Sequence, residues 1–349
     1  PDGAIYLADW YSPIIQHGEV SFRDPRRDHV HGRVWRITAK GRPLVARVDF
    51  TKESDRALLE YLKAPEDVSR RQARRVLSER YQIPADSSRG SGFRHTLVDW
   101  EASLDESDSE YGHHLLELLW LYQSLDWTHP DLLRTLIGDE DHRIRAAAVR
   151  CLADWQEQLT DGFELLGGAA TDGHPRVRLE AVRALVQTDS LQAAASIALA
   201  LDQPTDEFLD YALWRAFREL KERWLPAVQN GEFDFEGKPE HLVYALQSLG
   251  ASEAVASLVR LAKGKPNREK RSLDIWEIVS QVGDTAQLNE VWKVVADKQV
   301  SARAKARLLD GLIQSKRERG IDSMPSLAIL SHILADRNKM VKRSAIEAA

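Results

Sequence analysis

Residues 17–31 hold the densest group of side chains that could carry chemistry. Histidines, arginines and carboxylates are mixed there, and such a loop could bind a sugar, an anionic quinone cofactor or a metal ion. His29 and His31 are two residues apart, so on a strand both side chains point to the same side, as metal ligands would. The candidate ligand-binding residues are His17, Arg23, Arg26, His29 and His31.

The same charges have a second interpretation, in which they hold a long loop together. Asp24 and Asp28 flank Arg26 and Arg27, so internal ion pairs could tie the loop to the first helices. In this case the arginines and histidines engage nearby carboxylates, whereas a functional site would turn them toward an open pocket. We favour the structural interpretation, and we assign no catalytic residue and no metal site.

Other familiar chemical motifs are missing from the sequence. The single cysteine, Cys151, excludes an internal disulfide and a Cys-x-x-Cys-His haem attachment, and its apolar helical surroundings predict a small buried side chain. His113 and His114 are adjacent and lack the i, i+4 spacing of paired zinc ligands. The sequence also contains no Gly-rich phosphate loop, nucleophile elbow or His-Glu-x-x-His motif.

An internal repeat predicts the architecture. Residues 143–152 return 33 residues later as residues 176–185, each copy after an acidic turn, with an aliphatic residue, Arg, Ala and Leu in the same order. Such a period indicates stacked helix pairs, so we predict an all-α fold: an α-α superhelix of HEAT/armadillo-like repeats with a small N-terminal β-remnant. The residues expected in the repeat core are Ile144, Ala148, Leu152, Val177, Ala181 and Leu185.

The arginines of the repeat have a structural interpretation as well. Arg145 and Arg178 follow the aliphatic residue, and each could reach an acidic turn of a neighbouring repeat. We therefore predict a ladder of ion pairs with Asp139 and Asp172 that holds the repeats together, rather than a ligand site.

Fainter copies extend the pattern to about seven or eight repeats. Ala73 falls at the position of Ala148, residues 300–309 keep the spacing with Ala304 and Leu308 in place of Ala148 and Leu152, and residues 341–348 keep the start of the motif. The polar, small residues 84–92 read as an inserted loop. Helices are expected at 111–125, 130–138, 141–156, 175–187, 191–201, 205–222, 239–249, 252–262, 268–282, 285–296, 301–314, 325–334 and 339–348.

The first residues differ from the rest of the chain. Residues 1–48 form a β-remnant and loop, with strands expected around 4–8 and 32–38, and residues 49–349 form the solenoid. Two strands do not make a stable sheet alone. We therefore expect the two strands to pair with each other. We also expect the pair either to pack against the first helices or to complete a larger β-structure of which this chain is a fragment.

Charge and hydropathy exclude some roles. A net charge of -6 argues against nucleic-acid binding, which requires a basic face. No apolar run approaches the ~18 residues that would span a membrane. The chain opens at Pro1 within a motif and ends at Ala349 within a helical pattern, so we expect a fragment whose lack of a targeting signal is uninformative.

Two resemblances follow from these residues. The acidic turn with Val/Ile-Arg-x-x-Ala-x-x-Ala/Cys-Leu resembles HEAT repeats. Residues 1–19 and 22–37 resemble the end of the β-propeller in the "membrane-bound dehydrogenase" family typical of planctomycetes. That resemblance implies a parent protein with a sugar/sorbosone-dehydrogenase-like propeller, HEAT repeats and a C-terminal cytochrome c-type domain. It also implies haem c and a quinone cofactor in the parent, with none in this chain, and a periplasmic or extracytoplasmic location.

The sequence thus predicts a non-catalytic scaffold that joins a propeller domain to a cytochrome domain. Its expected partners are these adjacent domains and other proteins, with no nucleic acid and no membrane span. The alternative is that residues 16–31 contribute to a sugar- or quinone-binding active site of a dehydrogenase.

Overall fold

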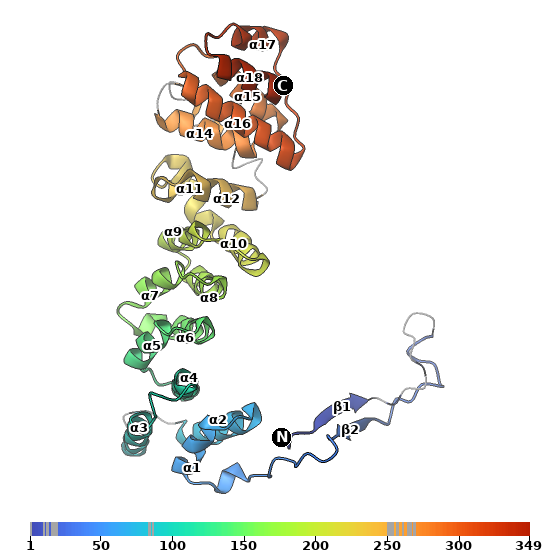
Figure 1. Cartoon of the computed structure of the whole chain (residues 1–349), viewed down its shortest axis with the longest axis vertical. Coiled ribbons are helices and arrows are strands. Elements are labelled where there is room, and N and C mark those ends of the chain that lie inside the picture. Colours follow the sequence, from blue (N-terminus) through green and yellow to red (C-terminus); the bar gives the residue numbers. More distant parts are fainter. Residues whose placement is uncertain are drawn as a thin grey trace. The chain divides into compact units, whose positions relative to one another are not determined.

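The computed structural model describes residues 2–9, 11, 14, 20–82, 85, 87–249, 255, 258–259, 262–263, 267 and 270–349. The chain divides into two compact units, Pro1–His129 and Pro130–Ala349. Each unit is described by itself (Figure 1).

The first unit begins with a two-stranded antiparallel ribbon. Strand β1 (Ile5–Asp9) pairs with β2 (Arg33–Ile37), so that Ile5 lies opposite Ile37 and Asp9 opposite Arg33. The predicted pairing of strands around 4–8 and 32–38 is therefore confirmed.

The ribbon does not pack against the first helices as we expected. Its apolar side chains are exposed, with Val34 at 72% and Ile5 at 63% of full accessibility. Polar contacts between the strands hold it instead: the Asp9 carboxylate accepts hydrogen bonds from Arg33 Nε and Trp35 Nε1, both at 3.1 Å. The prediction was wrong because these charged contacts satisfy the ribbon locally and no helix covers its described side chains.

A group of helices follows the ribbon in the first unit. They are α1 (Asp55–Glu60), α2 (Asp67–Tyr81), α3 (Ser88–Glu101) and α4 (Tyr111–Ser124), with 3-10 turns at Phe50–Lys52 and Tyr61–Lys63. α2 packs on α4, and α1 packs on α2 and α3. Trp100 of α3 is fully buried in this core.

Helix α3 corrects the loop expected at residues 84–92. Ser87 caps the helix by accepting a hydrogen bond from the Gly90 N–H at 3.1 Å. Phe93, Leu97 and Trp100 then bury one face. Gly90 and Gly92 lower helix propensity at its start, so tertiary burial outweighs the local sequence signal.

The second unit is a row of helices, most of them in antiparallel pairs (Figure 1). They are α5 (Pro130–Ile137), α6 (His142–Trp155), α7 (Gly162–Ala169), α8 (Pro175–Val186), α9 (Leu191–Ala198), α10 (Glu207–Glu219), α11 (Lys221–Asn230), α12 (Pro239–Leu249), α14 (Lys270–Val282), α15 (Thr285–Ala296), α16 (Ala302–Arg319), α17 (Leu327–Leu334) and α18 (Lys339–Ala348). Short 3-10 turns lie at Gln156–Gln158, Leu199–Asp202 and Phe235–Gly237. From α6 to α18, each even-numbered helix packs on the next. The predicted all-α repeat fold is confirmed.

Two helices of this unit were missed in the sequence. α7 contains Gly167 and Gly168, and α11 contains Pro226 in its interior. Glycine and proline both weaken the helical signal. Each helix nevertheless packs on α9, so the neighbouring repeat supplies what the local propensity lacks.

Helix caps set a common register along the even-numbered helices. The cap side chains of Asp141, His174, Asp206, Ser301 and Asn338 each accept a backbone hydrogen bond from the first turn. The third residue after each cap is buried: Ile144, Val177, Leu209, Ala304 and Val341. The six core residues predicted from the two clearest copies are all buried.

The same register corrects the alignment of residues 300–309. Ser301 caps α16, so Ala304 takes the position of Ile144 and not that of Ala148. Val300 precedes the helix. A slip of one helical turn keeps apolar residues on the same face, so the sequence pattern alone could not separate the two alignments.

Within the described residues, no helix is both long enough and apolar enough to cross a membrane.

Two glycines provide a matched test of the packing between repeats. A Cβ on Gly311 of α16 would lie 1.9 Å from Ser280 Oγ and 2.8 Å from Ser280 Cβ, on α14. A Cβ on Gly168 of α7 would meet no atom within 4 Å. We expect Gly311→Ala to lower the free energy of unfolding by about 1–3 kcal/mol. Gly168→Ala should leave it unchanged or raise it by up to about 1 kcal/mol. Urea denaturation measures both, and equal effects would contradict the packing.

Candidate functional site

The loop that carries the predicted ligand-binding residues is held by internal contacts. The Arg26 guanidinium donates two hydrogen bonds to the Asp24 carboxylate, both at 2.9 Å, and lowers the Asp24 pKa to about 2. Asp28 accepts from the backbone N–H groups of Val30 and His31 and contacts His31 Nδ1 at 2.9 Å. These hydrogen bonds lower the Asp28 pKa to about 2.

Arg27 organises the same loop, although it was not among the predicted ligand-binding residues. Its side chain is 9% exposed and donates to the carbonyls of Ser21 at 3.0 Å, Val20 at 2.9 Å and Ile14 at 3.4 Å. A buried arginine that binds three carbonyls fixes the path of a loop. The adjacent carboxylates in the sequence pointed to ion pairs, so the carbonyl partners could not be foreseen.

A cavity of about 720 Å³ lies beside this loop. Arg26, His29 and His31 line it together, whereas Arg23 does not. His17 lies outside the described residues. The structure thus brings three of the predicted residues to one cavity, and two of them, Arg26 and His31, also contact neighbouring carboxylates.

Arg145 contacts the acidic turn of the neighbouring repeat through Asp172, one of the two partners expected from the sequence. Arg145 donates to both oxygens of the Asp172 carboxylate, at 2.8 and 2.9 Å. A further guanidinium nitrogen donates to the Asp139 and Glu140 carbonyls at 2.9 Å. Arg145 therefore ties its own turn to the following one.

Arg178 occupies the same position one repeat later but contacts no carboxylate. It is fully buried and donates to the carbonyls of Asp172 and Pro204. Burial lowers its pKa. Pro204 lies two residues before Asp206, the cap of α10. The equivalent positions before the caps of α6 and α8 are occupied by Asp139 and Asp172. The predicted ion pair does not form at Arg178, because proline has no carboxylate at the position where Asp172 serves Arg145, and Arg178 binds the backbone carbonyl of Pro204 instead.

The ladder reappears near the C-terminus, where the sequence pattern is weak. Lys305 Nζ lies 3.0 Å from an Asp336 carboxylate oxygen, and the pair is largely buried. Lys305 follows its cap by four residues, and Asp336 precedes the next cap by two. Because these are the positions of Arg145 and Asp172, aligning the sequence on caps would have found the pair.

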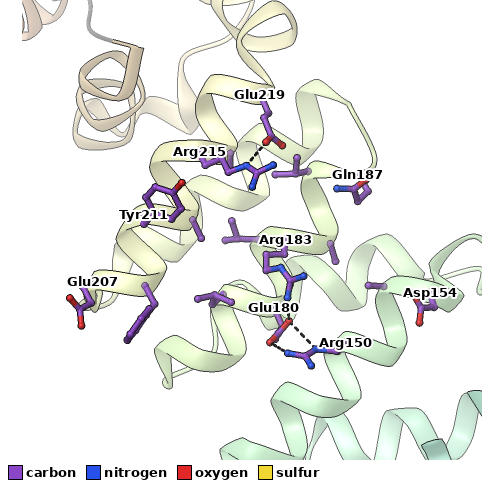
Figure 2. Close-up of a pocket in the computed structure, with 17 residues that line it drawn as sticks. Arg150, Asp154, Glu180, Arg183, Gln187, Glu207, Tyr211, Arg215 and Glu219 are labelled. Atoms are coloured by element: carbon purple, nitrogen blue, oxygen red, sulfur yellow. Dashed lines mark hydrogen bonds and ion pairs between the residues drawn. The ribbon is translucent and has the colours of Figure 1, made fainter. Parts of the chain in front are cut away.

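Helices α6, α8 and α10 form a groove of about 810 Å³ on the second unit (Figure 2). Its arginine end is centred on Glu180 of α8, whose side chain is 3% exposed. Arg150, Arg176 and Arg183 contact this one carboxylate at 2.5, 3.1 and 2.9 Å, and their own side chains are 54–61% exposed. Three cations around one anion leave an excess of two positive charges, which the Asp154 carboxylate of the same groove reduces to one.

The other end of the groove, its aromatic end, consists of Phe208 and Tyr211 on α10. Their exposed fractions are 66% and 62%. The Tyr211 ring stacks on that of Trp214, with centroids 5.8 Å apart, and this contact restricts the orientation of the exposed tyrosine. Glu207 and Glu219 lie at this end, and Glu219 accepts a 2.5 Å hydrogen bond from Arg215. This groove could not be recognised in the sequence, because its residues come from three repeats.

In the part of the chain that the structure describes, no group of three or more His, Cys, Asp or Glu side chains could hold a metal ion. Cys151 is buried, as predicted. The groove offers charge and apolar surface, which suit binding.

The chain is similar to one protein-family model and to several solved structures. Residues 129–217 match a family model of HEAT repeats. An engineered protein of known structure is 17% identical, with 85% of this chain and 95% of that chain covered and a TM-score of 0.23. A designed armadillo repeat protein in complex with the peptide (KR)4 is 14% identical, with 85% and 98% covered and a TM-score of 0.24. No curated protein matches the chain.

The ladder yields a prediction on stability. Arg145→Ala removes both hydrogen bonds to Asp172, whose side chain is 15% exposed, and leaves two turn carbonyls without this donor. We expect a loss of about 2–3 kcal/mol in the free energy of unfolding. Arg143→Ala, two residues away, removes the ion pair between Arg143 and Asp141. Because the Arg143 side chain is 80% exposed, this change should lower the free energy of unfolding by no more than about 0.5 kcal/mol. Equal losses in denaturant titrations would contradict the ladder.

A pair of histidines makes the second unit sensitive to acid. The rings of His142 and His174 stack with centroids 3.6 Å apart, and His174 Nδ1 accepts a hydrogen bond from the Arg176 N–H. Burial, and then the neighbouring His142, lower the pKa of His174 below its usual 6.5. Protonation at Nδ1 would remove the cap, because the nitrogen could no longer accept the hydrogen bond from the Arg176 N–H.

The unfolded chain therefore binds more protons at this site, and stability should fall as the pH drops below about 7 toward the folded-state pKa. His174→Asn keeps a capping oxygen without titrating, so it should flatten the dependence of the unfolding free energy on pH. His113 and His114, whose pKa values are also lowered by burial, should supply the remaining slope. His332→Asn, at an exposed position, serves as the control. An unchanged slope in His174→Asn would refute this role.

Proposed function

We propose that this chain is a non-catalytic scaffold that binds protein partners on its helical repeats. The groove of α6, α8 and α10 is the observation that carries this proposal, because it combines exposed aromatic rings with exposed arginines on a rigid repeat core. Exposed aromatic and arginine side chains are the groups that most often anchor protein interfaces.

We further propose that the scaffold belongs to a larger dehydrogenase-type protein, in which it joins a propeller domain to a cytochrome c-type domain. The resemblance of residues 1–19 and 22–37 supports this parent. The β1–β2 ribbon adds support, because it leaves Val34 and Trp35 exposed, as strands of a larger β-structure would. With a single cysteine, this chain cannot hold a haem through Cys-x-x-Cys-His, so haem c would belong to the adjacent domain. The parent would then lie in the periplasm or outside the cytoplasm.

A second candidate function concerns the loop. The 720 Å³ cavity lined by Arg26, His29 and His31 favours a contribution to a sugar- or quinone-binding site in the parent. Arginine and histidine side chains can donate hydrogen bonds to an anionic quinone or to the hydroxyl groups of a sugar. The contacts of Asp24 with Arg26 and of Asp28 with His31 favour a purely structural role for the loop.

The scaffold is tested in the complete parent protein by chemical cross-linking and mass spectrometry. We expect cross-links between residues 130–349 and the adjacent cytochrome segment, because a joining scaffold must touch what it joins. We also expect the 349-residue chain alone to show no dye-linked sugar oxidation. Sugar oxidation by the chain alone, or a complete protein without such cross-links, would overturn the proposal.

The loop is tested in the same protein by His29→Ala and His31→Ala. If the loop has only a structural role, dye-linked sugar oxidation should fall no further than thermal stability does. Abolished oxidation with an unchanged melting temperature would instead place the loop in the active site. Lys52→Ala, an exposed change outside the loop, is the control.

A further inference from the structure

Three arginines repeat at one position along the groove. Arg150, Arg183 and Arg215 each stand nine residues after the helix cap, which is Asp141, His174 or Asp206. All three line the groove, and they come from three successive even-numbered helices. The repeat register therefore aligns a cation from each of α6, α8 and α10 along one surface.

The charges around these arginines differ from one end to the other. At the arginine end, three guanidinium groups share the carboxylate of Glu180. At the aromatic end, Glu207 and Glu219 lie with Arg215, which Glu219 pairs. Asp154 also lines the groove, from α6. With Arg176, which contacts Glu180 but does not line the groove, the charged side chains at the α6–α8 end sum to +1, whereas those at the α10 end sum to −1.

The apolar groups follow the opposite gradient. Phe208 and Tyr211 stand exposed on α10, and Leu179 of α8 and Ala212 of α10 also line the groove. An occupant that matches both gradients carries negative charge over α8 and large apolar side chains over α10.

We propose that the groove binds an extended protein segment in which an acidic residue is followed, two and four residues later, by large apolar residues. This inference rests on the proposed function and names the class of partner. Packed helices lie about 8–10 Å apart, and an extended chain rises about 3.3 Å per residue with alternate side chains on one face. Positions i, i+2 and i+4 therefore cover the distance from the arginine end to the aromatic end. Glu180 stays bound to its arginines, which each keep donors free for the incoming carboxylate.

The experiment measures fluorescence anisotropy of labelled peptides with the 349-residue chain. The probe is Gly-Ser-Glu-Thr-Leu-Thr-Phe-Ser-Gly. One control peptide has Lys in place of Glu, and a second has Ala in place of Leu and Phe. We expect the probe to bind and each control to bind at least about tenfold more weakly, which corresponds to about 1.4 kcal/mol. Added salt should weaken the probe as the charged contact is screened.

Variants locate the binding. Arg183→Gln and Tyr211→Ala should each weaken the probe about fivefold. Arg75→Gln is the matched control for the arginine, because Arg75 also stands nine residues after its cap, in α2, and does not line the groove. Tyr6→Ala, on the exposed ribbon, is the control for the tyrosine. Thermal melting checks that all variants fold.

Several results would overturn this inference: no binding of the probe, preference for the Lys peptide, or equal effects of the groove variants and their controls. The outcome separates from that of the scaffold test. If cross-links form in the parent but the peptide does not bind, the scaffold proposal stands and the groove is rejected as its binding site. Peptide binding without cross-links would leave the groove as a binding site and remove the proposed joining role.

Discussion

The burial of an apolar residue three positions after the caps of α6, α8, α10, α16 and α18 is the constraint on which the second unit depends. A single helix pair cannot cover this side chain, so Ile144, Val177 and Leu209 become buried only when successive even-numbered helices pack together. The cap fixes where each helix begins, and hence which residue faces the neighbour.

The register places both the ladder and the groove. Four residues after the cap, a cation reaches the turn of the next repeat, as Arg145 does with Asp172 and Lys305 with Asp336. Nine residues after the cap, Arg150, Arg183 and Arg215 line the groove. The first set is largely buried and ties successive turns together, whereas the side chains of the second set are mostly exposed, and Arg150 among them also contacts Glu180 of the next even-numbered helix. Position within the repeat thus separates the buried cations from the exposed ones.

Much of the fold could be predicted from the sequence, and the reasons for the failures are physical. The pair of copies at 143–152 and 176–185 was sufficient for the repeat architecture, because its aliphatic and alanine positions recur without interruption. Helices α3, α7 and α11 were missed because Gly90, Gly168 and Pro226 mask helices that neighbouring repeats stabilise. The ribbon was expected to pack, but side chains such as Val34 are exposed.

The sites were harder to predict than the fold. Charged residues close in sequence drew attention to residues 17–31, where three predicted residues do line one cavity. The groove escaped notice because Glu180 and Tyr211 lie 31 residues apart and belong to different repeats. Arg178 shows the same limit, since its partner depends on Pro204 in the following turn. Only the cap register, read across repeats, brings such residues together.

Hydrogen exchange of the intact chain, followed by mass spectrometry, tests the central claim that neighbouring repeats stabilise one another in register. The account predicts that α6, α8 and α10 exchange slowest and become exposed together as denaturant is added, because each buries its aliphatic residue against the next. Opening of α8 while α6 and α10 remain protected would show that each pair is stable alone, and would contradict the account.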